Sequence, residues 1–413
     1  MFKIQKLLWL GMLILPLAVV SCEKIANDEE AIEPGIENDV IKTRLALSET
    51  EMKNIAPSND FAFRFFQKSF EDGTDMLLSP LGFQMTMAMI GNAVEDEKAM
   101  CEKLGFEGAG LDEMNTYFEH LIGSLSGDSF NKELKLANAL MADVRAAKYP
   151  GFFLDVLKSS YAADYNEIVA ESLQAQPMGN RPEDIWCQQK TDGLIKKAPF
   201  PIEEFQSSLL NVFLFKGEWQ DKFDKDLTDT RFFYSGPDKA AYASFMNKQD
   251  KVNFYGCDSF KAVSLPFGDG TFNLSIILPD LNDSVSGVLQ KLDSKTWNDT
   301  RNGFKKKEVR LSIPTFSTSY STRMLMDFSF KKGVPSLNLI GQEAMFLMNE
   351  EGASAAAVTQ ARAPISPGPS GTQGIEAFVA DRPFIYTISE AGSGLILFVG
   401  VYSGADKEPI EFK

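Results

Sequence analysis

Histidine is almost absent, with one residue, His120, in a chain of 413. This disfavours mechanisms that pair a serine or cysteine nucleophile with a histidine base, and metal sites built from several histidines. Basic residues are also outnumbered, with 41 Lys and Arg against 57 Asp and Glu and a formal net charge of −16. Because an acidic protein is repelled by phosphate backbones, the composition argues against nucleic-acid binding.

The short motifs of common enzyme classes are missing as well. The chain has no GxSxG, no P-loop, no HExxH and no GxGxxG. It matches SxxK, the acylating motif of penicillin-binding enzymes, at Ser329-Phe330-Lys331-Lys332, and so short a pattern is expected by chance. We therefore expect a protein that is not an enzyme and needs no metal or cofactor.

Cysteine is scarce, and its four positions do not suggest a disulfide framework. Cys22 closes the N-terminal apolar segment, whereas Cys101, Cys187 and Cys257 are far apart and lack CxxC spacing. An odd number of dispersed cysteines rarely forms a set of structural disulfides. We expect each of these three side chains to be a small buried hydrophobic group.

Residues 1–21 have the features of a secretory signal. Two lysines precede an apolar run, Leu7–Val20, that is too short for an ordinary membrane-spanning helix of about 20 residues. The run ends in Val19-Val20-Ser21-Cys22, which resembles the lipobox of bacterial lipoproteins, where the signal is cut before the cysteine and the thiol is acylated. We expect a lipid on Cys22; a plain signal peptide with an incidental cysteine is the alternative.

Residues 22–45 predict an acidic tether. They include Asp28-Glu29-Glu30 and several other acids, and they lack aromatic residues. Such a composition cannot bury enough apolar surface to become ordered. The folded domain would begin at about Ala46 and be held by its lipid on a bacterial cell envelope, at the periplasmic or outer-membrane surface.

Residues 46–413 show the pattern of one α+β domain. Ser58-Asn59 is predicted to cap a helix, and apolar residues recur at helical intervals over residues 111–125. His120 lies on that second helix, where a structural or solvent-facing role is expected. Apolar runs of strand length follow after residue 200, at 272–279 and 395–401. Helices early and strands late, without βαβ alternation, predict an α+β fold.

The segment 350–363 has a distinctive alternation. Alanine is a poor strand former, and Gly352 and the prolines after residue 363 suit an exposed loop. Yet the segment could also enter a sheet, because one face would carry only small side chains. It therefore suits an element with two states, with a linker of no function as the alternative. The small set is Ala353, Ala355, Ala357, Thr359, Ala361 and Ala363.

Motifs along the chain resemble those of the serpins, in order and spacing, from about Ala46 to the C-terminus. Glu350-Glu351-Gly352 and the alanine run resemble the proximal hinge of the reactive-centre loop. Residues 211–219 (NVFLFKGEW) resemble the breach strand with Trp219, and Leu78-Ser79-Pro80-Leu81 resembles the shutter. Further matches are Asn59-Asp60-Phe61, Trp186 with Thr191-Asp192-Gly193, Leu265–Gly270, Ile277-Leu278-Pro279, Val309–Pro314, Gly333, Ala380–Tyr386 and Phe398-Val399-Gly400.

The resemblance implies a fold and a mechanism. The fold has helices packed around three β-sheets, with a reactive-centre loop at about residues 350–379. The function is suicide-substrate inhibition of serine proteases, with cysteine proteases as a further class. The protease forms an acyl-enzyme, and the cut loop of the metastable inhibitor enters the central sheet and distorts the protease before deacylation. A non-inhibitory binding lipoprotein of the same fold is the alternative. The implied hinge residues are Glu350, Glu351, Gly352, Ala353, Ala355, Ala356, Ala357 and Thr359; the implied breach and shutter residues are Trp219, Ser79, Pro80 and Gln342.

Three positions depart from the family pattern. Gly82 occupies the place of the usual shutter serine, and Gln342 the place of the usual shutter histidine. Glutamine both donates and accepts hydrogen bonds, so it can gate the sheet in another way. Ala353 replaces the usual hinge threonine and is still small.

The scissile bond is predicted from the family spacing. Counting from Glu350 places Ser366 before the bond, but Pro367 follows, and most serine proteases cut poorly before proline. The bond Ile365-Ser366 is therefore our first choice, and it implies an elastase-like or subtilisin-like target.

Two other bonds remain open. Arg362-Ala363 would suit a trypsin-like protease, but it would shorten the inserted strand and favour plain cleavage over trapping. Counting back from Pro383 gives Thr372-Gln373 instead. The chain is expected to be a monomer whose partners are target proteases and, through Cys22, a membrane.

Overall fold

The computed structural model describes residues 42–128, 130, 133–145, 147–168, 179–198, 207–236, 238–325, 327–337, 339–353 and 374–404. No helix in these ranges is both long enough and apolar enough to cross a membrane. The helices are α1 (Glu49–Met52), α2 (Ile55–Ser69), α3 (Pro80–Gly91), α4 (Glu97–Lys103), α5 (Leu111–Leu125), α6 (Gly151–Tyr161), α7 (Pro182–Lys190), α8 (Val285–Leu289), α9 (Ser294–Gly303) and the 3-10 helix η3 (Lys225–Leu227).

The strands fall mainly in the second half of the chain, as the sequence predicts. They are β1 (Met76–Leu78), β2 (Leu134–Asp143), β3 (Ala163–Ile168), β4 (Ser207–Phe215), β5 (Gly217–Glu218), β6 (Asp229–Gly236), β7 (Lys239–Gly256), β8 (Phe260–Phe267), β9 (Phe272–Pro279), β10 (Lys305–Pro314), β11 (Phe316–Leu325), β12 (Leu339–Asn349), β13 (Gly352–Ala353), β14 (Glu376–Val379), β15 (Phe384–Glu390) and β16 (Ile396–Tyr402).

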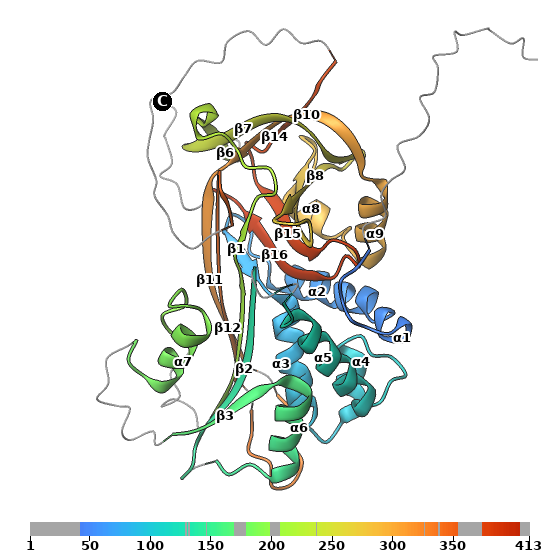
Figure 1. Cartoon of the computed structure of the whole chain (residues 1–413), viewed down its shortest axis with the longest axis vertical. Coiled ribbons are helices and arrows are strands. Elements are labelled where there is room, and N and C mark those ends of the chain that lie inside the picture. The colour runs from blue at the N-terminus through green and yellow to red at the C-terminus, as the bar shows by residue number, and fades with distance from the viewer. Residues whose placement is uncertain are drawn as a thin grey trace, which may run out of the picture. The chain divides into compact units, whose positions relative to one another are not determined.

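A tall sheet contains the elements that matter for function. Its strands run in the order β3-β2-β4-β12-β13-β5, and β11 pairs with the outer edge of β12. Figure 1 shows α7 on one side of this sheet and α3, α5 and α6 on the other. The alternation of strand side chains explains both layers. Leu140 and Leu209 join the main core, whereas Met141 and Leu210 pack with Trp186 of α7.

The remaining strands form a nine-stranded sheet in which β7 connects two parts. The first residues of this 18-residue strand pair with β6, its middle with β10, and its end with β8. The part around β8, β9, β15, β16 and β1 packs on the helices, and the part around β6, β10 and β14 lies beside the upper end of the tall sheet in Figure 1. The predicted fold of helices around three sheets is confirmed, with two of the sheets sharing β7.

Several sequence-based expectations are confirmed or corrected in detail. Helix α5 covers the predicted residues, and His120 on its exposed side binds the carboxylate of Glu51. Ser58-Asn59 does not cap a helix, because α2 begins one turn earlier at Ile55. Asn59 instead accepts from the backbone N–H of Ile396 and donates to the carbonyl of Gly394.

Cys101, Cys187 and Cys257 are free thiols, but they do not share one environment. Cys101 and Cys187 are buried, as expected, and burial raises the pKa of both. Cys257 is exposed, contrary to expectation, because it lies in the turn after β7 rather than inside a strand or helix.

The N-terminal border of the packed unit lies before Ala46. Thr43 Oγ1 and the backbone N–H of Arg44 both donate to the buried carboxylate of Glu390, each at 3.1 Å. Leu45 is buried in the main core. Residues 42–45, which the sequence assigns to the tether, therefore pack against the turn that follows β15.

Candidate functional site

The first residues of the predicted hinge already belong to the tall sheet. Gly352-Ala353 forms β13, which pairs antiparallel with Met348 and Asn349 of β12 on one side and with β5 on the other. Ala353 is 2% exposed and packs in the main core with Met348. The face predicted to carry only small side chains therefore begins, at Ala353, on the core side of the sheet.

Gly352 makes this entry possible. Its φ of +143° lies in a region that residues with a Cβ rarely adopt. A Cβ at this position would lie 2.2 Å from the carbonyl oxygen of Gly217 and 2.6 Å from the Cα of Glu218. Because both obstacles are backbone atoms, they cannot rotate away, and the close approach of β13 to β5 requires glycine.

The acidic pair before Gly352 is held by cations and a hydroxyl group. Glu351 lies 2.8 Å from both Lys222 and Lys225, and Lys222 also binds Glu218 at 2.9 Å. These two lysines lower the pKa of the Glu351 carboxyl to about 2. Thr228 Oγ1 donates to Glu350 Oε1 at 2.7 Å. All of these contacts join the hinge to the segment that follows β5.

Trp219 organises the backbone on the other side of the hinge. Its ring stacks on Phe267, with centroids 4.5 Å apart and planes within 10°. Its Nε1 donates to the carbonyl of Asn349 at 2.8 Å, and its backbone N–H donates to the carbonyl of Glu351 at 2.9 Å. The side chain is 3% exposed, so the hinge rests on a buried aromatic pair at the predicted breach.

The shutter residues meet where α3 begins beneath the tall sheet. Gln342 Oε1 accepts from the backbone N–H of Ser79 at 2.7 Å, and Gln342 Nε2 donates to the carbonyl of Ser79 at 2.9 Å. Ser79 Oγ donates to the carbonyl of Leu397 and caps α3 by accepting from the N–H of Gly82. Pro80 is the first residue of α3, where its fixed φ is tolerated. Gln342 thus connects β12 to the helix layer through two hydrogen bonds.

The lack of a side chain at position 82 is explained by Asn211 of β4. A Cβ on Gly82 would lie 2.2 Å from Asn211 Oδ1 and 3.2 Å from its Cγ. Asn211 is 9% exposed and donates through Nδ2 to Asn138 Oδ1 at 2.8 Å. Its Oδ1 is buried and has no hydrogen-bond partner among the described residues. The glycine therefore provides the space that the asparagine side chain occupies.

The junction between β4 and β12 is open along most of its length. Within the residues that the structure describes, these parallel strands pair at one position, Ile340 opposite Leu209. From that pair up to Met348, where β12 begins to pair with β13, each strand is paired among the described residues only with its outer neighbour, β2 or β11. The sheet therefore contains a place where one more strand can be added.

The chain after the predicted loop is anchored at the far edge of the nine-stranded sheet. Strand β14 pairs parallel with β10, from Glu376 opposite Val309 onward. The carboxylate of Glu376 binds Lys261 at 2.8 Å and Lys307 at 2.9 Å, and these lysines lower its pKa. The two ends of the predicted loop are thus fixed by a sheet strand and by ion pairs at each side.

The structure describes some of the predicted site residues but not all of them. The structure brings together Glu350, Glu351, Gly352 and Ala353 with Trp219, and it separately brings together Ser79, Pro80 and Gln342. The remaining predicted residues lie outside the described part of the chain. They are Cys22, Ala355, Ala356, Ala357, Thr359, Arg362, Ala363, Ile365, Ser366, Pro367, Thr372 and Gln373.

Sequence reasoning missed several partners of the hinge and shutter. Lys222, Lys225 and Glu376 carry no motif that marks them, because their ionic partners are distant in sequence. Asn211 could have been found, since an asparagine inside an apolar run of strand length predicts a buried polar contact.

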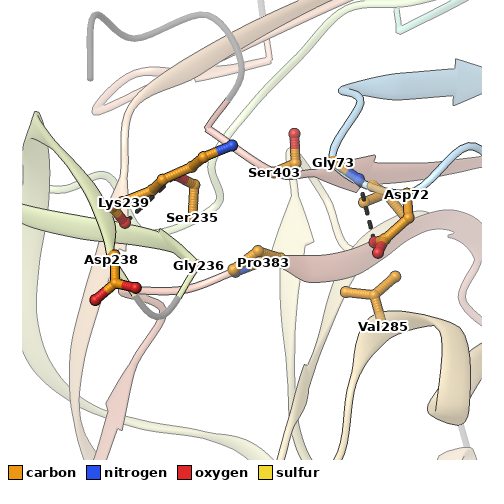
Figure 2. Close-up of a pocket in the computed structure, with 10 residues that line it drawn as sticks. Asp72, Gly73, Ser235, Gly236, Asp238, Lys239, Val285, Pro383 and Ser403 are labelled. Atoms are coloured by element: carbon orange, nitrogen blue, oxygen red, sulfur yellow. Dashed lines mark hydrogen bonds between the residues drawn. The ribbon is translucent and has the colours of Figure 1, made fainter.

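A cavity of about 400 Å³ lies away from these features, between the β6–β7 turn and the end of β16. Figure 2 shows Asp72 and Gly73 on one side, and Asp238 and Lys239 on the other. The hydrogen bonds drawn there are local, from Gly73 N to Asp72 Oδ1 and from Ser235 Oγ to the carbonyl of Lys239. Its lining residues include no histidine or cysteine.

Comparison with known proteins gives a consistent result. The family model described as Serpin (serine protease inhibitor) matches residues 56–404. Serpin-ZX of Arabidopsis thaliana is 25% identical over 79% of this chain and 91% of its own length. Intracellular coagulation inhibitor 2 of Tachypleus tridentatus is 25% identical over 83% and 88%.

Solved structures agree on the fold. The native state of tengpin, a thermophilic serpin, superposes with a TM-score of 0.73 and 22% identity over 87% of this chain and 97% of that one. A thyroxine-binding globulin complex with thyroxine gives the same TM-score at 21% identity, over 85% and 99%. At this identity the two structures support the fold alone.

Proposed function

The chain belongs to the serpin family, and on that basis we propose that it is a suicide-substrate inhibitor of serine proteases, with cysteine proteases as a further class. The observation that carries the proposal is β13: Ala353 is already a strand residue between β12 and β5, with its side chain in the core. Insertion of a cut loop would continue a strand that has begun.

The observed register supports insertion of the small set of side chains. Continued antiparallel from Ala353, it would put Ala355 between Phe346 and Phe215, both of which are buried. Two residues further, Ala357 would face Ala344 and Phe213. Bulky or charged groups at these points would collide with the core, whereas alanine fits.

The register also brings Thr359 to the shutter. It would lie between Gln342 and Asn211, whose Oδ1 lacks a partner within the described chain. Ala361 would then come between Ile340 and Leu209, the two residues that now pair directly. Complete insertion would therefore require that pair to separate, and the contacts of Gln342 with Ser79 resist that separation.

Strand length favours the proposed scissile bond. Residue 362 would lie opposite Leu339, where β12 begins, so a cut after Arg362 would leave the protease at the end of the sheet. A cut between Ile365 and Ser366 would leave residues 363–365 between that last paired residue and the acyl bond, so the bound protease would not have to fit against the end of the sheet. We therefore propose Ile365-Ser366 and an elastase-like or subtilisin-like protease, with Arg362-Ala363 and Thr372-Gln373 as the other bonds to examine.

The alternative, a non-inhibitory binding protein, rests on the shutter departures, Gly82 and Gln342, and on the fold shared with thyroxine-binding globulin. The first residues of the hinge oppose it, because Ala353 is small and inserted. For either function we propose that the chain is a monomer, carries a lipid on Cys22, and is held on a bacterial cell envelope. Mass spectrometry of the mature N-terminus, with Cys22→Ser as the control, tests the anchor.

The test of inhibition uses the chain from residue 22 onward with Cys22→Ser. It is incubated with an elastase, subtilisin and trypsin, and SDS-stable complexes are sought while mass spectrometry identifies the released C-terminal peptide. The expected result is a covalent complex and a peptide that begins at Ser366. Clean cleavage without a complex across the panel would instead favour the binding protein.

A matched pair of variants tests insertion itself. Ala355→Glu would place a charge on the core face, whereas Ala356→Glu would place the same charge on the opposite face, next to the partly exposed residues of β12. We expect Ala355→Glu to be cut without trapping the protease and Ala356→Glu to form complexes. Equal trapping by the two variants would contradict the proposed register.

A further inference from the structure

An exposed aromatic cluster lies on the hairpin formed by β6 and β7. Phe232 stacks on Tyr242, with ring centroids 4.8 Å apart and planes within 19°. The ring of Tyr234 lies 6.1 Å from that of Phe232. Tyr234 and Tyr242 are 47% and 50% exposed. Phe232, Tyr234 and Tyr242 are called the aromatic patch below.

The aromatic patch faces away from the protein interior. Phe232 and Tyr242 are directly opposite each other in the β6–β7 register, so their side chains share one face. The neighbouring residue, Phe233, points the other way: it is fully buried and packs edge-on against Tyr402. The core is therefore complete without the patch, and grouped exposed aromatic rings commonly mark a contact surface.

The position of the patch relates it to both ends of the loop. Thr228, one residue before β6, donates to Glu350 of the hinge, and Tyr234 lies on the same strand about 20 Å further along. On its other edge β7 pairs with β10, which carries β14, where the chain returns after the loop. Figure 1 shows β6, β7, β10 and β14 together at one end of the molecule, and Thr228 connects these strands to the hinge.

A protease that cuts the chain between Ala353 and Gly374 acts on a segment whose two described ends are anchored beside these strands. A protease interface covers about 800 Å² on each partner, which is some 30 Å across and comparable with the distance from Thr228 to Tyr234. The charges beside the patch include a neutralised pair, Asp229 with Arg231, and the local turn carries both Asp238 and Lys239. This surface lacks the excess of positive charge that an anionic membrane would attract.

We propose that the aromatic patch is a secondary contact surface for the protease that attacks the loop, and this rests on the proposed function. Tyrosine and phenylalanine rings fixed on a strand lose little conformational freedom on binding, and aromatic residues are frequent among the energetically dominant residues of interfaces. The patch would hold the protease over the loop before acylation. It would therefore set the rate of capture and the choice of protease, but not the insertion step.

The test compares Tyr234→Ala/Tyr242→Ala with the parent chain from residue 22 that carries Cys22→Ser. Tyr165→Ala on β3, whose ring is 38% exposed, is the control for loss of an exposed tyrosine elsewhere. Second-order rate constants for complex formation and for loop cleavage are measured with an elastase, subtilisin and trypsin. We expect the double variant to lose about fivefold or more with at least one protease. Its stoichiometry of inhibition and the rise in Tm on loop cleavage should be unchanged.

The outcomes separate this proposal from the proposed function. If the parent chain is cut without forming complexes, inhibition fails, and the cleavage rates still report on the patch. Rates within twofold of the parent for every protease that cuts the loop would overturn the proposal, as would the same loss in Tyr165→Ala.

The parent chain could also sediment as a dimer that the double variant no longer forms. With rates unchanged, that result would assign the patch to contacts between copies of the chain. Retention of the rate by Tyr234→Phe/Tyr242→Phe would show that the rings make the contact.

Discussion

The side-chain amide of Gln342 binds both backbone polar groups of Ser79, the N–H at 2.7 Å and the carbonyl at 2.9 Å. The two hydrogen bonds connect β12 to the start of α3 in the layer beneath the sheet. They lie just beyond Ile340, where β12 still pairs with β4. A neutral side chain with one donor and one acceptor in a plane suits this backbone pair, so the contact does not depend on a titrating group.

Gln342→Ala should destabilise the native state by about 1–3 kcal/mol, because it leaves a buried N–H and a buried carbonyl of Ser79 without partners. Gln342→Glu should also destabilise, because it removes the donor and introduces a buried charge. Urea unfolding of the uncut chain measures both effects. If Gln342→Ala unfolds like the parent, the shutter contact has no energetic role.

Gly352→Ala should cost about 1–3 kcal/mol, because φ of +143° and two backbone atoms oppose a Cβ there. Gly123→Ala is the matched control: no atom lies within 4 Å of its new Cβ, and it lies inside α5. That control should stabilise by up to about 1 kcal/mol. The urea unfolding midpoints of the two variants, measured with equal slopes, give the comparison. Similar effects of the two substitutions would argue against the close approach of β13 to β5.

Gly82→Ala should destabilise through its contact with Asn211 rather than through the helix. The new Cβ would lie 2.2 Å from Asn211 Oδ1, so Asn211 must rotate and lose its hydrogen bond to Asn138. Asn211→Ala should therefore relieve part of the cost of Gly82→Ala. A double-mutant cycle should give a coupling of about 1–2 kcal/mol. Strict additivity would mean that the two positions do not compete for the same space.

Acidification should weaken the hinge through Glu351. The pKa of its carboxyl is lowered from 4.5 to about 2 in the folded state, so its ion pairs contribute stability above pH 4.5 and lose it as the pH falls toward 2. The fluorescence of Trp219, which donates hydrogen bonds to the carbonyls of Asn349 and Glu351, reports on the conformation of the hinge. Glu351→Gln should remove this part of the pH dependence, and Glu119→Gln on the exposed face of α5 should not. Identical pH profiles for parent and Glu351→Gln would exclude the ion pairs as its source.

Loop cleavage should raise the Tm sharply. Residues 354–362 would pair with both β4 and β12, and net hydrogen bonds of about 0.5–1.5 kcal/mol each give a gain on the order of 10 kcal/mol. For a domain of this size, whose unfolding entropy is about 2.1 cal/mol/K per residue, the gain corresponds to roughly 13 °C. Calorimetry of uncut and cut protein measures it, with Ala355→Glu as the variant in which the rise should be absent. An unchanged Tm in the parent would remove the energy source for trapping.

The fold could be predicted largely from periodicity and ordered motifs. The helix over Leu111–Leu125 and the strand Phe272–Pro279 have the predicted bounds, because local amphipathic patterns determine them. The start of α2 differs from the prediction because tertiary packing buries Ser58 and Asn59 inside the helix, which begins after Asn54 without a side-chain capping hydrogen bond.

The site was less accessible to sequence reasoning. The small alternation predicted which face of the hinge enters the core, and Ala353 lies there. Long-range contacts carry no local signal: Glu351 meets Lys222, Glu350 meets Thr228, and Gly82 makes room for Asn211 only after the chain has folded. The departure at Gly82 was visible in the sequence, but its cause was not.

The pairing of Gly352 and Ala353 in the sheet before any cleavage affects the competition between two rates, that of deacylation and that of loop insertion. In the proposed mechanism, deacylation of the acylated loop frees the protease, so insertion must finish first. Adding a strand normally begins with an unfavourable nucleation step, in which backbone order is imposed before hydrogen bonds repay it. Here the nucleus exists before the protease arrives, so insertion starts at the elongation phase. A protease with rapid turnover would therefore still be captured with few inhibitor molecules lost as substrate.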